Sequence, residues 1–404
     1  MSQRQRHAVV AGAGIGGLTA ALALHRRGWR VTVCERAPGP TAVGAGIVLA
    51  PNALRAFDSV GFDPAAACAG SGAPEAPEAP AATGAMSLRD RSGRRLSRTD
   101  TAALTARYGR PPLPVHRQTL TAALTAALPE GALAYDAAVT GVDRAGCGAG
   151  GRAVVRTGLG DLTADAVVAA DGIHSPLRRQ HFPDHPGLRY AGETAWRTVL
   201  SGVAAPEGCE TWGRGQRFGT VPLADGRLYL YATAVVPAGY RPTDVRAELL
   251  RRFGGWHDPI PALLERIDPA VVLQHDLYDL AGPLPRLHDG RVAWIGDAAH
   301  AMNPSLGQGA CQAVEDAAVL GHLLDAVDPA DVAAALAAYS RARLARTDAV
   351  RVRARRAGRM ASLTHPLAVA ARDLAVRATP ARVTRRALDG LFDGFTLPAR
   401  AEAE

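Results

Sequence analysis

The chain has 404 residues, a length that favours two domains or one enlarged α/β domain over a single small core. Its 48% hydrophobic and 21% charged content suits a globular protein in water, and no run of about 20 apolar residues predicts a membrane span. The formal net charge is +8 and the chain contains no lysine, which excludes a Schiff-base lysine and a Walker P-loop.

The cysteines and the N-terminus indicate a reducing compartment. Five scattered cysteines form no CxxC pair, so we expect neither a disulfide framework nor a metal site. Glycines interrupt the first apolar stretch, which argues against a secretory peptide and favours a cytoplasmic protein. The surplus of basic charge is diffuse and favours an anionic cofactor over nucleic acid.

The first element is a βαβ unit with a dinucleotide-binding fingerprint. An apolar strand at residues 9–11 leads into G-x-G-x-x-G, a helix that ends near Gly28, and a second strand that stops at Glu35. The first glycine permits a tight turn, the second admits a pyrophosphate and the third lets helix and strand pack: they are Gly12, Gly14 and Gly17. Glu35, 23 residues after Gly12, can bind a ribose diol, so the motif predicts FAD or NAD and not NADP.

After the βαβ unit, residues 71–85 are rich in proline and alanine and predict a loop.

Two later segments end strands of the same kind as those of the βαβ unit. In residues 162–180 an apolar strand ends at Asp171 and Gly172, and Ser175 followed by Pro176 predicts a helix start. Residues 291–324 repeat the pattern, with Asp297 at the end of a strand and a helix from about Gly309.

The remaining segments predict a separate sheet and a basic helix. Residues 188–236 alternate as strands, with a turn at residues 224–226. After Tyr339 the chain is rich in arginine and helical in pattern. Such a helix could contact a membrane or nucleic acid, but we favour a helix that packs on the nucleotide domain with a solvated arginine face.

The three motifs together carry a family resemblance. GxGxxG, then ADGIHSPLR, then GDAAHAMNPSLGQGACQAVEDA resembles the class A flavoprotein monooxygenases, the para-hydroxybenzoate hydroxylase-like family, in its branch of salicylate hydroxylases, zeaxanthin epoxidases and FAD-dependent urate hydroxylases. The resemblance covers residues 9–339. It implies an α/β fold: a Rossmann-like FAD-binding domain of the GR2 type with an inserted β-sheet substrate domain and a C-terminal helical segment.

The same resemblance implies how the domains divide the chain. The FAD-binding domain would comprise residues 1–70, 101–182 and 283–340. A loop and strands of the substrate domain would occupy residues 71–100, its main β-sheet residues 183–282, and the C-terminal helices residues 341–404.

The resemblance also assigns roles around FAD. Glu35 and Arg36 would hold the adenosine ribose, Arg117 would reach the phosphates and Val139 would lie beside adenine. Asp297 would bind a ribityl hydroxyl, the segment at 46–48 would follow the ribityl chain or ring, and residues 307–310 would touch the pyrimidine edge. The whole expected set is Gly12, Gly14, Ile15, Gly16, Gly17, Glu35, Arg36, Gly46, Ile47, Val48, Arg117, Val139, Asp171, Gly172, Asp297, Gly307, Gln308, Gly309 and Ala310.

The implied activity is oxygenation of a small molecule. NADH or NADPH would reduce the flavin, O2 would form a C4a-hydroperoxide, and one oxygen atom would be added to an aromatic or polyketide substrate. Pro304 would pack near the reactive face, and the helix from Gly309 would stabilise the reduced flavin. No second complete βαβ fingerprint is present, so the nicotinamide cofactor would bind transiently. His300 could act as a base, but we favour a side chain that faces the backbone or a flavin phosphate.

The substrate side leaves alternatives open. Arg217 and Tyr229 fall where urate hydroxylases place a substrate-facing arginine and tyrosine, but Ser305 replaces the acid that pairs with that arginine, which disfavours urate. An apolar pocket could be lined by Trp196, Trp212, Phe218, Tyr231 and Tyr278, but most of these residues could equally belong to the core.

Other activities compete with hydroxylation. They are epoxidation of an alkene, oxidative inactivation of a polyketide antibiotic, and a non-enzymatic flavin-binding role. Halogenation is disfavoured, because residues 255–261 lack the second tryptophan of G-W-x-W-x-I-P and the chain has no lysine. We expect no nucleic-acid or membrane partner, and the pattern leaves monomer and homodimer open.

Overall fold

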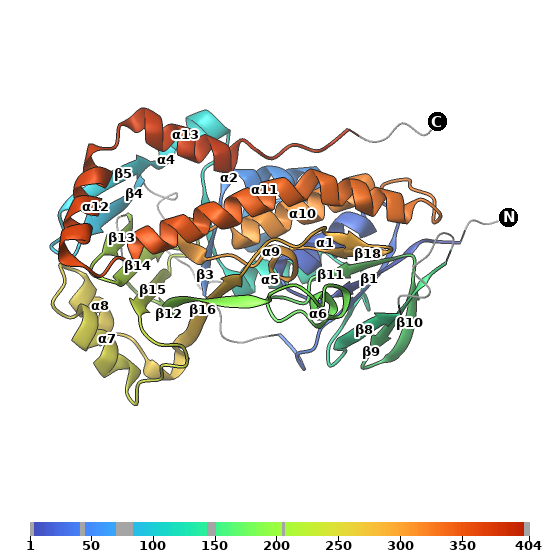
Figure 1. Ribbon diagram of the computed structural model, residues 1–404, viewed down its shortest axis with the longest axis horizontal. Helices are drawn as coiled ribbons and strands as arrows, with labels where there is room; N and C mark the ends of the chain where they lie inside the picture. Colours follow the sequence, from blue (N-terminus) through green and yellow to red (C-terminus); the bar gives the residue numbers. More distant parts are fainter. Residues whose placement is uncertain (1–3, 41–44, 70–83, 144–150, 204–206, 400–404) are drawn as a thin grey trace.

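A mostly parallel sheet collects strands from distant parts of the chain. The computed structural model describes residues 4–40, 45–69, 84–143, 151–203 and 207–399. The strand order is β17-β18-β11-β1-β2-β7, and only β17 runs antiparallel to its neighbour. Figure 1 labels β18, β11 and β1 of this sheet. The strands are β1 (His7–Ala11), β2 (Arg30–Cys34), β7 (Leu133–Ala134), β11 (Ala166–Ala169), β17 (His288–Asp289) and β18 (Val292–Trp294). Every residue of β1 and β11 is buried, as expected for central parallel strands.

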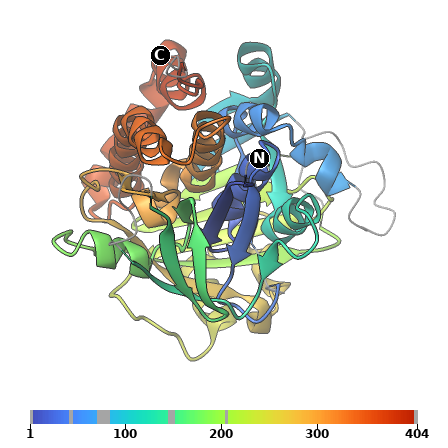
Figure 2. The same cartoon turned by 90° about the vertical axis from the view of Figure 1, so that its right-hand side faces the viewer.

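Helices cover this sheet and bury its core. In Figure 2, α10 and α11 lie above the strands, and α1 contacts both α10 and β1. Leu22, Trp294 and Val319 belong to the core that these layers enclose. The helices of this part are α1 (Ile15–His25), α2 (Pro51–Val60), α3 (Pro64–Ala69), α5 (Arg117–Ala126), α6 (Pro176–His181), α9 (Asp297–His300), α10 (Gly309–Leu323) and α11 (Val332–Ala361).

A seven-stranded sheet forms the second layer of the molecule. Its order is β16-β12-β15-β14-β13-β4-β5, and only β13 and β4 pair in parallel. The strands are β4 (Ala85–Asp90), β5 (Arg95–Asp100), β12 (Leu188–Leu200), β13 (Gly208–Trp212), β14 (Gln216–Pro222), β15 (Leu228–Val235) and β16 (Leu273–Leu280). The turn predicted at residues 224–226 joins β14 to β15, and the φ of Gly226 is +79°.

The two faces of this sheet differ. On one face Trp196 and Phe218 pack against Phe253 of α7 (Val245–Phe253) and Leu263 of α8 (Ile260–Glu265). Of the two alternatives left open for Trp196 and Phe218, the structure supports the core: both pack under α7 and α8, on the face of the sheet that points away from β3. Side chains alternate along a strand, so Arg217, Tyr229 and Tyr231 lie on the opposite face.

Smaller elements complete the fold. A two-stranded sheet pairs β3 (Gly46–Leu49) with β6 (Leu113–His116), and a three-stranded antiparallel sheet contains β8 (Val139–Asp143), β9 (Ala153–Thr157) and β10 (Gly160–Ala164). The rest are α4 (Thr101–Tyr108), α12 (Pro366–Ala378), α13 (Ala381–Phe392) and the short 3-10 helices η2 (Pro269–Val271) and η3 (Pro304–Leu306). Most of the predicted loop at residues 71–85 and of the turn at residues 147–151 lies outside the described residues.

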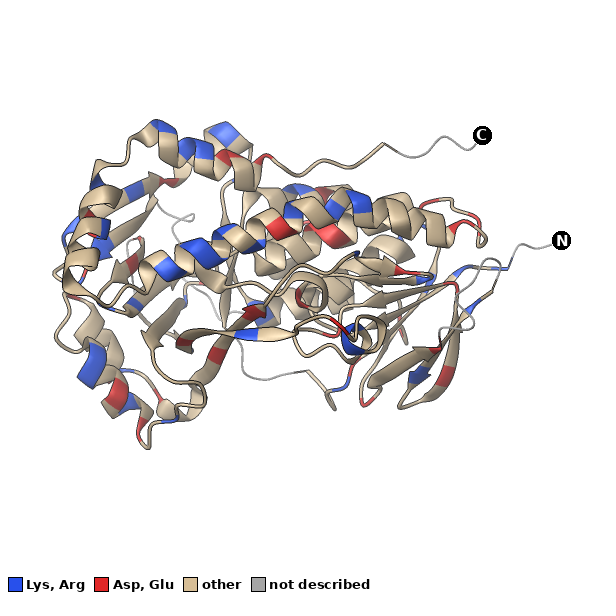
Figure 3. Ribbon diagram, in the orientation of Figure 1, with Lys and Arg blue, Asp and Glu red and all other residues tan. Residues whose placement is uncertain are grey.

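The arginine-rich helix α11 packs on α10 as expected, but its arginines are not all solvated. Figure 3 shows basic residues spaced along α11. Arg343 and Arg351 are only 2% and 3% exposed. Arg343 pairs with Glu315 and Asp316 of α10, and Arg351 donates to the carbonyl oxygen of Leu280. Arg341, Arg356 and Arg359 are exposed, in keeping with the predicted solvated face. On the inner side of the helix, Arg343 meets carboxylates that the sequence pattern did not pair with it.

Candidate active site

The glycine motif forms a tight loop between β1 and α1. Gly12 has a φ of +103°, and a Cβ there would lie 2.5 Å from the carbonyl oxygen of Ala170 at the end of β11. A Cβ on Gly17 would lie 2.0 Å from the carbonyl oxygen of Gly12, whereas a Cβ on Gly14 would have no neighbour within 4 Å. Two glycines are thus required by packing, and Gly14 leaves an open surface. The N–H groups at the start of α1 face this opening, which suits a pyrophosphate.

The next two residues of the motif anchor α1. Ile15 is buried, and a Cβ on Gly16 would lie 3.0 Å from the Cβ of Ala313 in α10. The helix that follows the first motif therefore packs closely on the helix that follows the third.

Glu35 lies beside this loop at the end of β2. Its Oε2 accepts a hydrogen bond from the Ala13 N–H at 2.8 Å, and its Oε1 accepts one from the Ala37 N–H at 2.9 Å. A carboxylate offers about four acceptor positions, so capacity remains for a diol. Arg36 is exposed next to it, and the Ala137 N–H donates to the carbonyl oxygen of Glu35, which brings the strand that starts with Val139 to the same corner.

The second motif lies next to the first. A Cβ on Gly12 would lie 3.4 Å from the Cα of Asp171, so the Asp171–Gly172 turn is adjacent to the glycine loop. Burial raises the pKa of Asp171, and its Oδ1 is a buried atom that has no hydrogen-bond partner among the described residues. Ser175 caps α6 as predicted, because its Oγ accepts from the Arg178 N–H at 2.9 Å.

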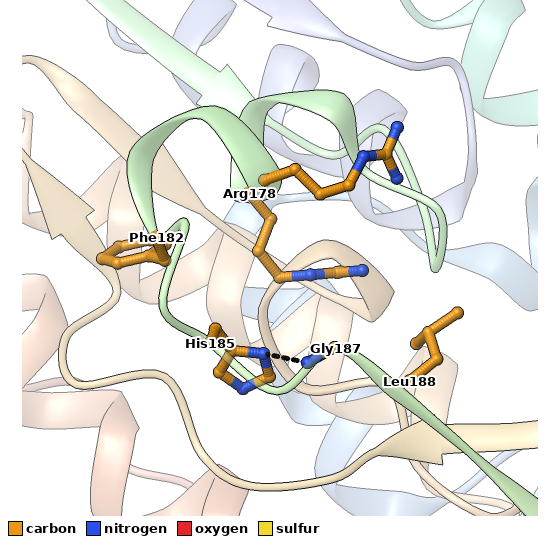
Figure 4. Close-up of a pocket in the computed structure, with 6 residues that line it drawn as sticks. Arg178, Phe182, His185, Gly187 and Leu188 are labelled. Carbon is orange, nitrogen blue, oxygen red and sulfur yellow. Dashed lines mark hydrogen bonds between the residues drawn. The ribbon is translucent and has the colours of Figure 1, made fainter.

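Arg178 joins the second motif to the third. Its Nη1 donates to the carbonyl oxygens of Asp297 and Ala298 at 3.3 and 3.0 Å. Figure 4 shows Arg178 on a neighbouring cavity of about 110 Å³, with Phe182, His185, Gly187 and Leu188 around it. Small-molecule sites usually span about 300–1,000 Å³, so this cavity is too small for a dinucleotide.

The third motif presents a carboxylate and a helix start. Asp297 is exposed at the first position of α9, after Gly296 with a φ of +58°. Gly307 has a φ of +62° and α10 begins at Gly309, as predicted. Gln308 is 1% exposed; its Oε1 accepts from the Asn52 amide at 3.0 Å, and its Nε2 is buried without a partner among the described residues.

A buried ionic network behind this loop was missed by the sequence analysis. Asp316 accepts from the Gly296 N–H at 3.0 Å, from Arg343 Nε at 2.7 Å, and lies 2.6 Å from His300 Nε2. Glu315 pairs with Arg343 and with Arg346. The network fixes the turn that carries Asp297. His300 Nε2 faces the Asp316 carboxylate and not the backbone or a phosphate as expected, because the acid of α10 lies directly behind the turn. Two adjacent acids in an otherwise apolar helix were the available signal.

The β3 segment faces the inner side of the seven-stranded sheet. A Cβ on Gly46 would lie 2.5 Å from Cγ of Tyr229, so glycine is required there by the tyrosine ring. Ile47 and Val48 are half-buried beside it. The Arg117 N–H donates to the carbonyl oxygen of Ala45 at 3.0 Å, and the Arg117 side chain is exposed at the start of α5. The predicted flavin segment and the predicted substrate tyrosine are therefore in contact.

Arg217 lies on the same face of the sheet. Its Nη1 donates to Ser305 Oγ at 2.9 Å, which joins β14 to the loop that contains the exposed Pro304. Its Nη2 donates to Glu193 at 2.6 Å. The structure thus brings Arg217, Tyr229 and the third motif together, but it buries Arg217 in ion pairs and does not leave it free toward a substrate.

These residues fit FAD. The open surface over Gly14 suits the phosphates, and the exposed carboxylate of Asp297 suits the ribityl chain. The helix start at Gly309 and half-buried Ala310 suits the flavin ring. The unpartnered Nε2 of Gln308 and Oδ1 of Asp171 are buried polar atoms beside these segments, and such atoms normally have a partner.

Comparison with known proteins supports the same interpretation. A family model described as FAD binding domain matches residues 5–354. The aurachin C monooxygenase/isomerase of Stigmatella aurantiaca is 38% identical over 344 residues, which cover 84% of this chain and 85% of that protein. The FAD-dependent urate hydroxylase of Klebsiella pneumoniae is 33% identical, with 89% and 90% covered. The chain belongs to the class A flavoprotein monooxygenases.

Solved structures agree with this assignment of the monooxygenase. Klebsiella pneumoniae HpxO complexed with FAD and uric acid matches with a TM-score of 0.84 at 30% identity, over 96% of each chain. The predicted family, the α/β fold with its C-terminal helices and FAD as cofactor are thereby confirmed. Within the described residues, no helix of the monooxygenase is long and apolar enough to cross a membrane.

Proposed function

We propose that this monooxygenase uses NADH or NADPH and O2 to add one oxygen atom to an aromatic or polyketide small molecule. The observation that carries the proposal is that the inner face of the seven-stranded sheet meets the segments that fit FAD: Arg217 of β14 donates to Ser305 Oγ of the third motif, and Tyr229 of β15 contacts Gly46 of β3. Val221, Leu223 and Tyr229 pack with half-buried Val48 and Val199 at this junction. This packed apolar cluster would border a flavin held by β3 and the third motif.

Bound FAD would supply the oxygen activation, and the protein would position the reactants. The start of α10 would stabilise negative charge on the flavin with its N–H groups and dipole. The apolar residues of the sheet and β3 would exclude water, and Pro304 would limit the approach to the ring. The FAD contacts expected from the sequence, from Gly12 of the first motif to Ala310 of the third, are part of this proposal, as are Tyr229 and Pro304 as catalytic residues. Arg217, expected as a third catalytic residue, enters the proposal as a positioning residue, because its guanidinium is held by Glu193 and Ser305.

The relatives differ in their substrates, so they do not choose one for this chain. A 3-amino-4-hydroxybenzoate 2-monooxygenase of Streptomyces cremeus is 34% identical over 388 residues, alongside the urate and aurachin C enzymes. Arg217 meets uncharged Ser305 where urate hydroxylases carry an acid, so we do not favour urate.

The test separates an enzyme from a flavin-binding protein without activity. The purified protein is loaded with FAD, and NADH or NADPH oxidation and O2 consumption are followed with a panel of aromatic and polyketide compounds. We expect at least one compound to accelerate both and to gain one oxygen atom by mass spectrometry. A yellow protein that oxidises neither nucleotide faster with any compound would contradict the proposal. Product analysis also distinguishes a hydroxylated from an epoxidised product.

A further inference from the structure

The C-terminal helices carry most of the large apolar side chains that are exposed. Among the described residues eight such side chains are exposed, and five of them lie on these helices or next to them: Val235, Met360, Leu367, Leu374 and Val383. Leu367 and Leu374 of α12 are 75% and 67% exposed. Val235 adjoins the start of α12, because a Cβ on Gly215 would contact both Val235 and Thr364. A single exposed leucine is ordinary, whereas a group of them marks a contact surface.

The outer face of α12 is apolar along the whole helix. Exposed residues recur there at spacings of three and four positions, which places them on one side: Leu367, Ala370, Ala371, Leu374 and Ala378. We call these five residues the α12 stripe. A helix side that faces water normally carries polar residues, and this one carries none. In Figure 1, α12 lies at the left end of the molecule, opposite the N-terminus.

A buried arginine holds the inner face of α12 and so fixes which side points outward. Arg372 donates to the carbonyl oxygens of Ala361 and Gly213 at 3.0 and 3.3 Å, and its guanidinium lies over the Trp212 ring. Arg372 also pairs with Asp373 at 2.8 Å, and both side chains are buried. The exposure of the α12 stripe is therefore set by the packing of the opposite face, and Asp373 adds no negative charge to the outer face.

Basic charge surrounds the α12 stripe. Residues 356–386 contain seven arginines and a single acid, Asp373, so they hold most of the net charge of +8. Four exposed arginines lie in the last turn of α12 and the first turns of α13, where Figure 3 shows basic residues: Arg377, Arg382, Arg385 and Arg386. Within the described part of the chain, none of these four forms a hydrogen bond or an ion pair.

The combination of apolar and basic side chains favours one kind of partner. A second copy of this chain in a two-fold contact would bring the arginines of one surface against the same arginines of the other. A nucleic acid would match the arginines, but its phosphates and sugars offer no apolar surface to Leu367 and Leu374. An anionic lipid surface offers headgroup phosphates to the arginines and acyl chains to the leucines.

We propose that α12 and the start of α13 bind the surface of an anionic membrane, with the α12 stripe inserted among the headgroups. The helix would lie in the plane of the interface, a contact that requires no membrane-spanning segment. The proposal departs from the sequence-based expectation of no membrane partner, because the pattern after Tyr339 does not show which leucines stay exposed. It goes beyond the proposed function, since it concerns a surface of the protein and not the reaction.

The test measures vesicle binding by the FAD-loaded full chain. Sedimentation with vesicles of phosphatidylcholine is compared with sedimentation with vesicles of equal parts phosphatidylcholine and phosphatidylglycerol. We expect at least about tenfold tighter binding to the mixed vesicles, because each basic side chain at an anionic surface strengthens binding about fivefold. High salt should remove most of this difference, since salt screens the charges.

Variants then locate the contact on α12. Leu367→Ser combined with Leu374→Ser should weaken binding to the mixed vesicles at least about tenfold, and Leu374→Ser alone at least about threefold. Flavin content and the urea midpoint should stay at wild-type values, because both leucines are exposed. The matched control is Leu159→Ser, which removes a leucine that is 58% exposed in the turn between β9 and β10. This control should bind like wild type.

Several results would overturn the proposal: equal binding to the two kinds of vesicle, no binding to either, or an equal effect of Leu159→Ser. A wild-type dimer that the double variant dissociates in sedimentation velocity would assign the α12 stripe to a second copy instead. Binding of duplex DNA without binding of vesicles would assign the arginines to a nucleic acid. These measurements use neither NADH, NADPH nor a substrate, so they are independent of the proposed function.

Discussion

Replacing Asp316 by asparagine tests whether the buried network behind the third motif supports the fold. Asp316 is fully buried, and although burial would raise its pKa, His300 and Arg343 lower the pKa from 3.8 to about 2. That difference corresponds to about 2 kcal/mol of folding free energy at neutral pH. In the variant, an amide N–H would also face the N–H of Gly296 or a guanidinium N–H, so we expect Asp316→Asn to cost about 2–4 kcal/mol.

The assay is urea unfolding of the apoprotein at pH 7, followed by tryptophan fluorescence, since Trp29 and Trp294 are fully buried in the same domain. With a slope of about 4 kcal/mol per molar for a chain of this size, the midpoint should fall by roughly half a molar or more. The control Asp348→Asn removes a partly exposed carboxylate that pairs with Arg351, and should cost less than about 1 kcal/mol.

The pH dependence has a definite sign. A carboxyl with a lowered pKa contributes stability above its unfolded value, so the difference between wild type and Asp316→Asn should be constant above about pH 4 and shrink as the pH falls toward 2. Flavin content should fall as well, because Asp316 holds the Gly296 N–H of the turn before Asp297. Equal urea midpoints for the Asp316 and Asp348 variants would refute the reasoning.

Two further predictions concern the flavin loops. Gly17→Ala places a Cβ 2.0 Å from the carbonyl oxygen of Gly12, so this variant should be less stable than wild type even as the apoprotein. Gly14→Ala meets no atom within 4 Å, so it should unfold like wild type but bind FAD at least about tenfold more weakly. Urea unfolding measures the stability and titration measures FAD binding, and equal behaviour of the two variants would contradict the assigned roles. Asp297→Ala should keep the wild-type unfolding midpoint, because the Asp297 side chain is exposed. The variant should lose flavin on gel filtration, which lowers the ratio of flavin to protein absorbance. Full FAD occupancy would count against a ribityl contact.

Local sequence patterns predicted the parts of the site that depend on backbone geometry. The positions that need glycine, such as Gly12 and Gly17, and the Ser175 cap follow from rules that act within a few residues. The helix start at Gly309 and the strand pattern of residues 188–236 were predicted for the same reason. These features are fixed by hydrogen bonds and steric limits that hold in any fold.

The ionic contacts could not be predicted, because their partners come from distant segments. Arg217 meets Glu193 and Ser305, which are 24 and 88 positions away, and Arg343 meets Asp316 across two helices. An arginine pattern on a helix does not show whether its guanidinium groups face water or buried acids. The side of the sheet that Trp196 and Phe218 occupy likewise depends on which face α7 and α8 cover.

The parallel sheet has a consequence for how the protein is made. The strand β18 pairs with β11 and precedes the loop that carries Asp297, yet it begins only at Val292. A ribosome must therefore translate about three quarters of the chain before β18 and the Asp297 turn, the last segments that fit FAD, can form. We therefore expect nascent chains that end before Val292 to bind FAD much more weakly than the full chain.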